Sequence, residues 1–121
     1  MKKLCIFFVF SIFLIINVSA WSAEDLDIIN GGHWVTSSME QKRAFLFGVG
    51  NILEIEQAMA GDKYEALRGH SIVPVLLEGL SGISIADLVM KLNKYYAEQP
   101  QNENKAVIEV LYHMAKENMK K

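Results

Sequence analysis

Histidine side chains titrate near neutral pH and bind metals, and the chain has three of them, His33, His70 and His113. The H-E-x-x-H pattern of a helical zinc site does not occur in the sequence. Glu109 and His113 are four residues apart and would share one helix face, but two ligands do not complete a metal site. We therefore interpret them as an ordinary surface pair, and we expect no metal centre and no cofactor.

Glu54 and Glu56 have the residue type of a general acid–base pair but not its geometry. Two positions on a helix are separated by about 200° around the axis, so these carboxylates cannot converge on one substrate. If Glu54 points inward instead, its charge needs a partner such as Arg68. A polar site assembled in three dimensions from His33, Glu54, Arg68 and His70 is the arrangement that would support a small enzyme or a ligand-binding protein.

Other motifs that carry chemistry are incomplete. The sequence has no G-x-S-x-G elbow, and neither Gly31-Gly32 nor Gly48-x-Gly50 follows the strand that a dinucleotide-binding loop requires. Gly48 and Gly50 fall inside a predicted helix, where each costs about 1 kcal/mol relative to alanine. We prefer a close helix–helix approach or a kink as the reason, and the alternative is backbone access for a ligand. No catalytic residue and no enzymatic activity are expected.

Tyrosine and tryptophan rings often anchor protein interfaces, and the candidates here are Trp34, Tyr64, Tyr95 and Tyr112. The alternative for Trp34 is that it packs as a hydrophobic staple beside the first long helix. Tyr96 continues a buried stripe and Tyr95 points about 100° away from it. The alternative for this pair is that both rings seal the end of a helix bundle. The sequence therefore predicts a contact surface for another protein, built on aromatic rings.

The composition describes one small acidic domain. Lys and Arg total 12 and Asp and Glu total 14, so the formal charge is −2. Without the first twenty residues the counts are 10 and 14, which gives −4. Nucleic acid and anionic lipid both require clustered cations, so neither is expected as a partner.

Residues 1–20 have the layout of a secretory signal peptide. Two lysines precede an apolar run over residues 4–16, and V-S-A then offers a cleavage site. A retained membrane anchor is the alternative, but a spanning helix needs about 20 apolar residues and this run is shorter. We expect cleavage after Ala20, with Ala23 as the second site, and a periplasmic or secreted protein with no stable membrane anchor.

The single cysteine, Cys5, would leave with the signal peptide. The mature protein would then have no disulfide, no thiol nucleophile and no thiolate metal site. Its fold must depend on core burial alone.

Residues 21–35 are predicted to form a loosely held N-terminal arm with one short turn over residues 24–29, because Gly31-Gly32 interrupts any periodicity. A single helical domain follows over residues 36–121. Its first long helix begins with a capping box in which Ser37 is the N-cap and Glu40 reaches back to it. Gly61 ends this helix after Ala60. The helix is expected to bury a broad apolar face made of Phe45, Leu46, Val49, Ile52, Leu53 and Met59.

Three more helices complete the predicted fold. A short one lies within residues 71–80, where Pro74 suits a first turn, although residues 72–77 alone are also compatible with a buried strand. The next begins at an N-cap Ser84 and ends before Pro100. The last extends from about residue 103 to residue 118. The sum is an all-α bundle of about four helices, two long and one or two short, without disulfides.

The order of these features resembles a group of small exported bacterial helical proteins that are distantly similar to the Rap/Tai immunity proteins of type VI secretion. The likeness covers most of residues 32–112. Its opening is G-H-W-V-T-S-S-M at residues 32–39 with Lys42, Phe45 and Gly48. Its middle consists of Leu80, Gly82, Ser84, Leu92, Tyr95, Tyr96 and Pro100, and its closing helix covers residues 107–112.

The resemblance implies a periplasmic, mostly helical and often dimeric protein that blocks a cell-wall amidase by occluding its active cleft. The Rap/Tai proteins commonly carry paired cysteines, which the mature chain lacks. We therefore expect an exported, non-enzymatic protein-binding module, with an immunity-type inhibitor as its most specific form and a homodimer as a further expectation. The alternatives are the small enzyme or ligand-binding protein described above and an envelope accessory or stress factor.

Overall fold

The computed structural model describes residues 27–121. The α-helices are α1 (Gly31–Thr36), α2 (Met39–Ala60), α3 (Val73–Gly79), α4 (Ile85–Glu98) and α5 (Val107–Asn118), with 3-10 helices η2 (Gly61–Leu67) and η3 (Pro100–Asn102). No strand occurs in this range, so the predicted all-α class is confirmed. The predicted signal peptide, residues 1–20, and residues 21–26 of the predicted arm lie outside the described residues.

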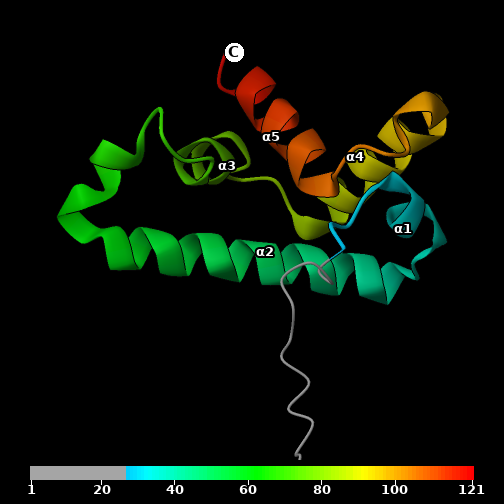
Figure 1. The fold of residues 1–121 in the computed structure, drawn as a ribbon, viewed down its shortest axis with the longest axis horizontal. Coiled ribbons are helices and arrows are strands. Elements are labelled where there is room, and N and C mark those ends of the chain that lie inside the picture. The colour runs from blue at the N-terminus through cyan, green and yellow to red at the C-terminus, as the bar shows by residue number, and fades with distance from the viewer. Residues whose placement is uncertain (1–26) are drawn as a thin grey trace, which may run out of the picture.

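The long helix α2 forms one layer of the molecule, and α1, α3, α4 and α5 all lie on one side of it (Figure 1). The core lies between these layers, and its most deeply buried side chains are Trp34, Leu76, Val89, Leu92, Val107 and Leu111. Burial of this apolar surface is the main source of stability in a domain that contains no cysteine within residues 27–121.

The predicted capping box at the start of α2 is one residue out of register. Ser38, not Ser37, is the N-cap, and its partner is Gln41: the Gln41 N–H donates to Ser38 Oγ at 3.2 Å and the Ser38 N–H donates to Gln41 Oε1 at 2.8 Å. Ser37 does not cap α2, because it bonds to α1 instead. Its N–H donates to the Trp34 carbonyl at 3.2 Å and its Oγ donates to the His33 carbonyl at 2.7 Å. Ser37 therefore ends α1, and the next serine begins α2.

The prediction of a loose arm up to residue 35 is wrong from Asn30 onward. Asn30 caps α1 by accepting the His33 N–H at 3.2 Å. The Gly31 N–H donates to the Lys105 carbonyl at 3.1 Å. A Cβ on Gly31 would lie 2.5 Å from Tyr96 Cδ1, so only glycine permits this close approach. Gly31-Gly32, which interrupts the sequence pattern, is therefore the point at which α1 packs onto the domain. The described part of the predicted turn, residues 27–29, is not helical.

The remaining helices follow the prediction closely. Residues 73–79 are helical rather than a strand, with Pro74 in the first turn. The Ser84 hydroxyl accepts the Asp87 N–H at 3.1 Å and caps α4 as expected. The last helix begins at Val107 instead of residue 103, because η3 occupies residues 100–102 and the Val107 N–H donates to the Ile29 carbonyl at 2.9 Å.

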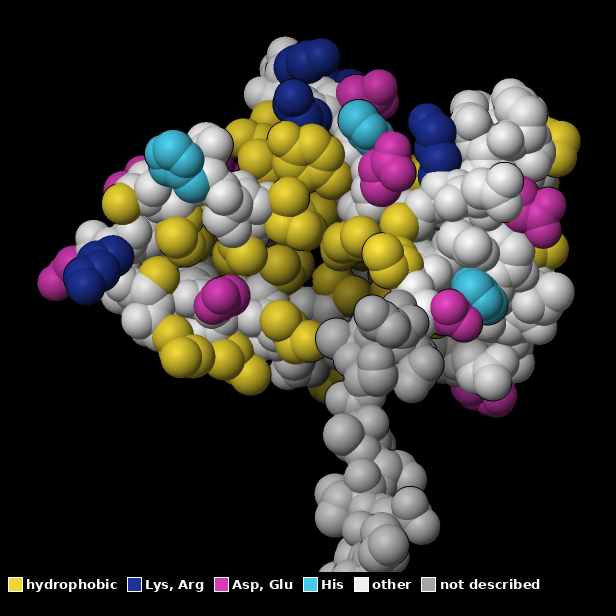
Figure 2. All heavy atoms as spheres, viewed as in Figure 1, with side chains coloured by type: hydrophobic (Ala, Val, Ile, Leu, Met, Phe, Trp, Pro, Cys, Tyr) yellow, Lys and Arg dark blue, Asp and Glu magenta, His cyan; other side chains and the backbone are white. Residues whose placement is uncertain are grey.

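The predicted buried face of α2 is broader than the face that the structure buries. Leu46 and Leu53 are buried and Val49 is partly buried, but Ile52 is 66% exposed and Met59 is 80% exposed. Figure 2 shows hydrophobic side chains along the lower left edge of the molecule, over the C-terminal half of α2. A single layer of helices covers only one side of α2, so the outer apolar residues have no packing partner among the described elements.

The two glycines inside α2 do not serve a close approach to another described helix of the same chain. A Cβ built on Gly48 or on Gly50 would meet nothing within 4 Å. The predicted close approach is therefore wrong for the helices within residues 27–121, and the predicted kink stays a prediction.

Because the Tyr96 hydroxyl is buried, we expect the protein to lose stability at alkaline pH. Its ring is 3% exposed and its hydroxyl donates to the Lys105 carbonyl at 3.0 Å. Burial, with smaller contributions from Tyr95 and Glu109, raises the pKa of Tyr96 from 10.0 to about 12. Because the folded-state pKa is the higher one, this stabilisation is present below pH 10 and is lost as the pH rises from 10 to 12, an effect of about 2 to 3 kcal/mol.

Urea unfolding at several pH values between 8 and 12 would measure this loss. Tyr96→Phe is expected to cost about 1 kcal/mol at pH 8 through the lost hydrogen bond, and its free energy of unfolding should fall less steeply above pH 10. Parallel pH profiles for the two proteins would contradict the assignment to Tyr96.

Candidate functional site

An open groove of about 720 Å³ lies between α2 on one side and α3 with the start of α4 on the other. Its floor belongs to the apolar core and consists of Leu46, Leu53, Leu76, Leu88 and Leu111. Its walls carry the partly buried side chains of Val49, Leu77, Leu80 and Ile83. The groove therefore offers apolar surface that is continuous with the core.

Glycines shape two parts of this groove. Gly82, with φ of +77°, forms the turn between α3 and α4, a backbone conformation that favours glycine. Gly50 lies on the α2 wall, where it leaves the backbone uncovered. The position of Gly50 fits the alternative of backbone access, whereas Gly48 does not line the groove.

Tyr64 brings a polar atom into this apolar lining. Its side chain comes from η2 and is partly buried, and its hydroxyl oxygen is buried without a hydrogen-bond partner among the described residues. Burial, followed by the negative charge of Glu78, raises the pKa of Tyr64, so the phenol is a neutral donor at ordinary pH. A buried hydroxyl without a partner is uncommon and costly, so it is a group that a bound molecule could satisfy.

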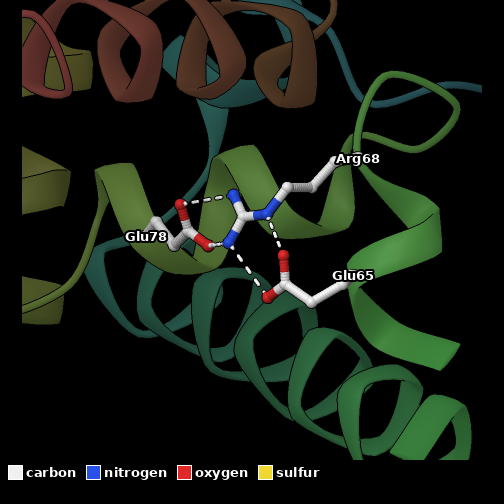
Figure 3. A network of polar contacts seen from close by, with 3 residues as sticks. All are labelled: Glu65, Arg68 and Glu78. Atoms are coloured by element: carbon white, nitrogen blue, oxygen red, sulfur yellow. Dashed lines mark hydrogen bonds and ion pairs between the residues drawn. The ribbon is translucent and has the colours of Figure 1, made fainter. Parts of the chain in front are cut away.

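The rim of the groove is acidic. Arg68 lies between two glutamates (Figure 3): its Nε donates to Glu65 Oε2 at 2.5 Å and its Nη1 donates to Glu78 Oε2 at 3.0 Å. Hydrogen bonds from Arg68 lower the pKa of both carboxyls. These pairs tie η2 to α3 but leave one negative charge uncompensated. Glu54, on the α2 wall, is exposed and adds a second uncompensated negative charge.

The four residues of the predicted polar site do not converge. Arg68 pairs with Glu65 and Glu78 rather than with Glu54. His33 is exposed on α1, at the opposite end of the molecule from η2 (Figure 1), and its Nδ1 accepts the Asn30 N–H at 3.3 Å.

The other histidines are exposed as well. His70 lies in the turn after η2, and His113 Nε2 lies 3.8 Å from Glu109 Oε1, which confirms the predicted surface pair. Within residues 27–121 no group of three or more His, Cys, Asp or Glu side chains could hold a metal ion.

The four predicted interface aromatics also fail to form one surface. Trp34 is 1% exposed and packs edge-to-face on Phe45 at 6.4 Å between ring centroids, so it cannot contact a partner. Tyr95 is partly buried and accepts a hydrogen bond from Asn102 Nδ2 at 3.0 Å. Tyr112 lies on α5, with Lys116 Nζ 5.6 Å from its ring centroid. Only Tyr64 of the four lines the groove.

Most of the residues that line the groove carry no functional signal in the sequence. Leu77, Leu80 and Ile83 are apolar residues in or next to short helices, a pattern that indicates core packing. Glu78 carries no motif. Glu54, Tyr64 and the interior glycine Gly50 are the groove residues that the sequence singles out, each for a different reason.

No family model, no curated protein and no solved structure matches this chain. None of the helices within residues 27–121 is long and apolar enough to span a membrane.

Proposed function

We propose that the protein is an exported, non-enzymatic binding module that holds an apolar segment of another protein in the groove between α2 and α3. The observation that carries the proposal is the combination of an open apolar floor with the unpartnered Tyr64 hydroxyl and an acidic rim. Helices and extended peptides bind in this way, with apolar anchors in a groove and polar contacts at its edge.

The charges at the rim favour a basic partner segment. The charged residues that line the groove among residues 27–121 are Glu54 and Glu78, and Glu78 is paired with Arg68, which also pairs with Glu65. Opposite charge on a partner increases the rate of association and excludes acidic competitors more than it adds affinity. Contact is favoured over catalysis because neither His33 nor His70 lines the groove that Glu54 lines.

An immunity-type inhibitor of a cell-wall amidase is the most specific form of this proposal. It is supported by the resemblance over residues 32–112 and by the predicted signal peptide. In this form the toxin would present a basic, apolar edge of its cleft to the groove. Inhibition would be steric and would need no reacting group from this chain.

A carrier of a small apolar molecule is the second candidate. The groove volume of about 720 Å³ lies within the range of small-molecule pockets, and Tyr64 would supply its one buried donor. Native mass spectrometry of protein purified from cells would reveal a bound small molecule and would favour this candidate.

Site-specific photo-crosslinking in living cells tests the leading proposal. A photoreactive residue at Ser81 or at Gln57, both exposed and both lining the groove, is expected to capture one protein. The same residue at Ala97, which is exposed on α4 and outside the groove, is the matched control. Capture should fall at least about tenfold when Glu54→Lys reverses the charge at the rim, since like charges at a contact suppress binding. The absence of a groove-specific product, or equal capture at Ala97, would contradict the proposal.

A further inference from the structure

The outer face of α2 carries an apolar stripe that is separate from the groove. It consists of Ala44, Gly48, Ile52, Ile55 and Met59, which fall within about 80° of one another around the helix axis. Ile52, Ile55 and Met59 are 66%, 57% and 80% exposed. All the other described helices lie on the opposite side of α2 (Figure 1), so no described element covers this stripe.

We propose that this stripe, hereafter the α2 stripe, binds the α2 stripe of a second copy of the chain in antiparallel orientation. The residues change in size along the helix. Its N-terminal half has the small residues Ala44 and Gly48, and its C-terminal half has the large residues Ile55 and Met59. A two-fold axis near residues 51 and 52 places Ala44 opposite Met59 of the second copy and Gly48 opposite Ile55. Ile55 and Met59 then each meet a small residue, and the two Ile52 side chains meet beside the axis.

Parallel pairing would not fit the same residues. It would set glycine against glycine at one end and leave a gap, and it would crowd methionine against methionine at the other. The open space around Gly48, where a Cβ meets nothing within 4 Å, is the space that the antiparallel arrangement fills with Ile55 of the second copy. This gives the interior glycine, which costs helix stability, a packing role between copies.

The dipole of α2 favours the same orientation. Antiparallel helices bring the positive N-terminal end of each dipole beside the negative C-terminal end of the other, whereas parallel helices would place like ends together. The interface is isologous, as in most homodimers.

The expected dimer is weak. A helix of 22 residues is about 33 Å long and about 10 Å wide, which places a pair of helices at the small end of specific interfaces. Sedimentation equilibrium of the purified protein over a concentration range of about 1–500 µM should therefore show a mass that rises from one chain to two.

Two exposed methionine or isoleucine positions provide matched variants. Ile52→Lys would place two ammonium groups beside the two-fold axis and should weaken dimerisation at least about tenfold, since like charges at an interface repel. Met90→Lys is the control, because Met90 is 61% exposed on α4, away from the α2 stripe. It should leave the equilibrium unchanged.

A size swap tests the register independently of charge. Gly48→Ile alone should weaken the dimer by opposing two large residues, while circular dichroism shows an intact fold. Gly48→Ile combined with Ile55→Gly restores the match of large with small and should restore dimerisation to within about threefold. A single-chain mass at every concentration, equal effects of Ile52→Lys and Met90→Lys, or no recovery in the double variant would overturn the proposal. The result is independent of the groove, whose crosslinking positions Ser81 and Gln57 lie outside the α2 stripe.

Discussion

Replacing Trp34 with alanine is expected to lower the free energy of unfolding by about 3–5 kcal/mol, the range found for large aromatic side chains truncated in a core. Trp34 is 1% exposed and is among the largest fully buried side chains of residues 27–121. A small domain has only about 5–15 kcal/mol of total stability. The variant should therefore be partly unfolded at physiological temperature.

The contacts of Trp34 explain why the loss of stability in Trp34→Ala should lie at the high end of this range. Its ring packs on Phe45, and its Nε1 donates to Asn93 Oδ1 at 2.9 Å. Lys42 Nζ donates to the same oxygen at 3.0 Å and lies 5.5 Å from the ring centroid. The indole thus joins α1 to both α2 and α4, and its removal leaves a cavity at the junction of three helices.

Urea denaturation followed by circular dichroism would measure this loss. Trp34→Phe serves as the control, because it keeps an aromatic ring beside Phe45 and removes only the larger ring and its N–H. Asn93 Oδ1 keeps the Lys42 bond in this variant, so we expect a cost of about 1–2 kcal/mol. If Trp34→Ala and Trp34→Phe differ by less than the error of the measurement, Trp34 does not fill a packed core.

Local signals in the sequence predicted the helices better than they predicted what packs on what. The Ser84 cap, Pro74 and Gly61 each act through their own backbone neighbourhood, and the structure confirms all three. The error at Ser37 has a non-local cause. Two adjacent serines can each cap a helix, and the choice depends on α1 ending at Ser37, which no local pattern around α2 reveals.

Gly31 and Ile52 illustrate the same limit for packing. Gly31 was interpreted as an interruption, yet it permits the contact with Tyr96, a residue 65 positions later in the sequence. Ile52 has the spacing of a core residue but is exposed, because periodicity identifies apolar faces without showing how many of them find a partner.

The candidate site was less predictable than the fold. Glu54 and Tyr64 were named from the sequence for different reasons, and the structure places both on the same groove. His33 and His70 were grouped with Glu54 by residue type alone. A groove forms where helices fail to meet, and that property belongs to the arrangement of helices rather than to any residue pattern.

Gly79→Ala should be the most damaging change of a single methyl group in residues 27–121. A Cβ on Gly79 would lie 2.6 Å from both Cα and the carbonyl carbon of Ala115, and closer still to the Ala115 oxygen. These are backbone atoms of α5, so no side-chain rotation can relieve the clash. Either α3 or α5 must shift, and we expect a loss of about 3 kcal/mol, the upper part of the range for overpacked cores.

The shift should also break a hydrogen bond between the same two helices. Asn118 Nδ2 donates to the Gly79 carbonyl at 3.0 Å, which holds the end of α3 against the last turn of α5. The contact of Leu76 with the core depends on the same crossing, since Leu76 is 0% exposed one turn earlier on α3. A displaced α3 would therefore also open the groove floor.

Gly50→Ala is the matched control, because it adds the same methyl group inside a helix where a Cβ meets nothing within 4 Å. Alanine restrains the unfolded chain and favours the helix, so this variant should gain about 0.5–1 kcal/mol. Thermal and urea unfolding of the two variants beside the parent protein would measure shifts of opposite sign. A Gly79→Ala protein as stable as the parent would show that α3 and α5 do not cross at this distance. The described packing of α3 and α5 against each other would then be wrong.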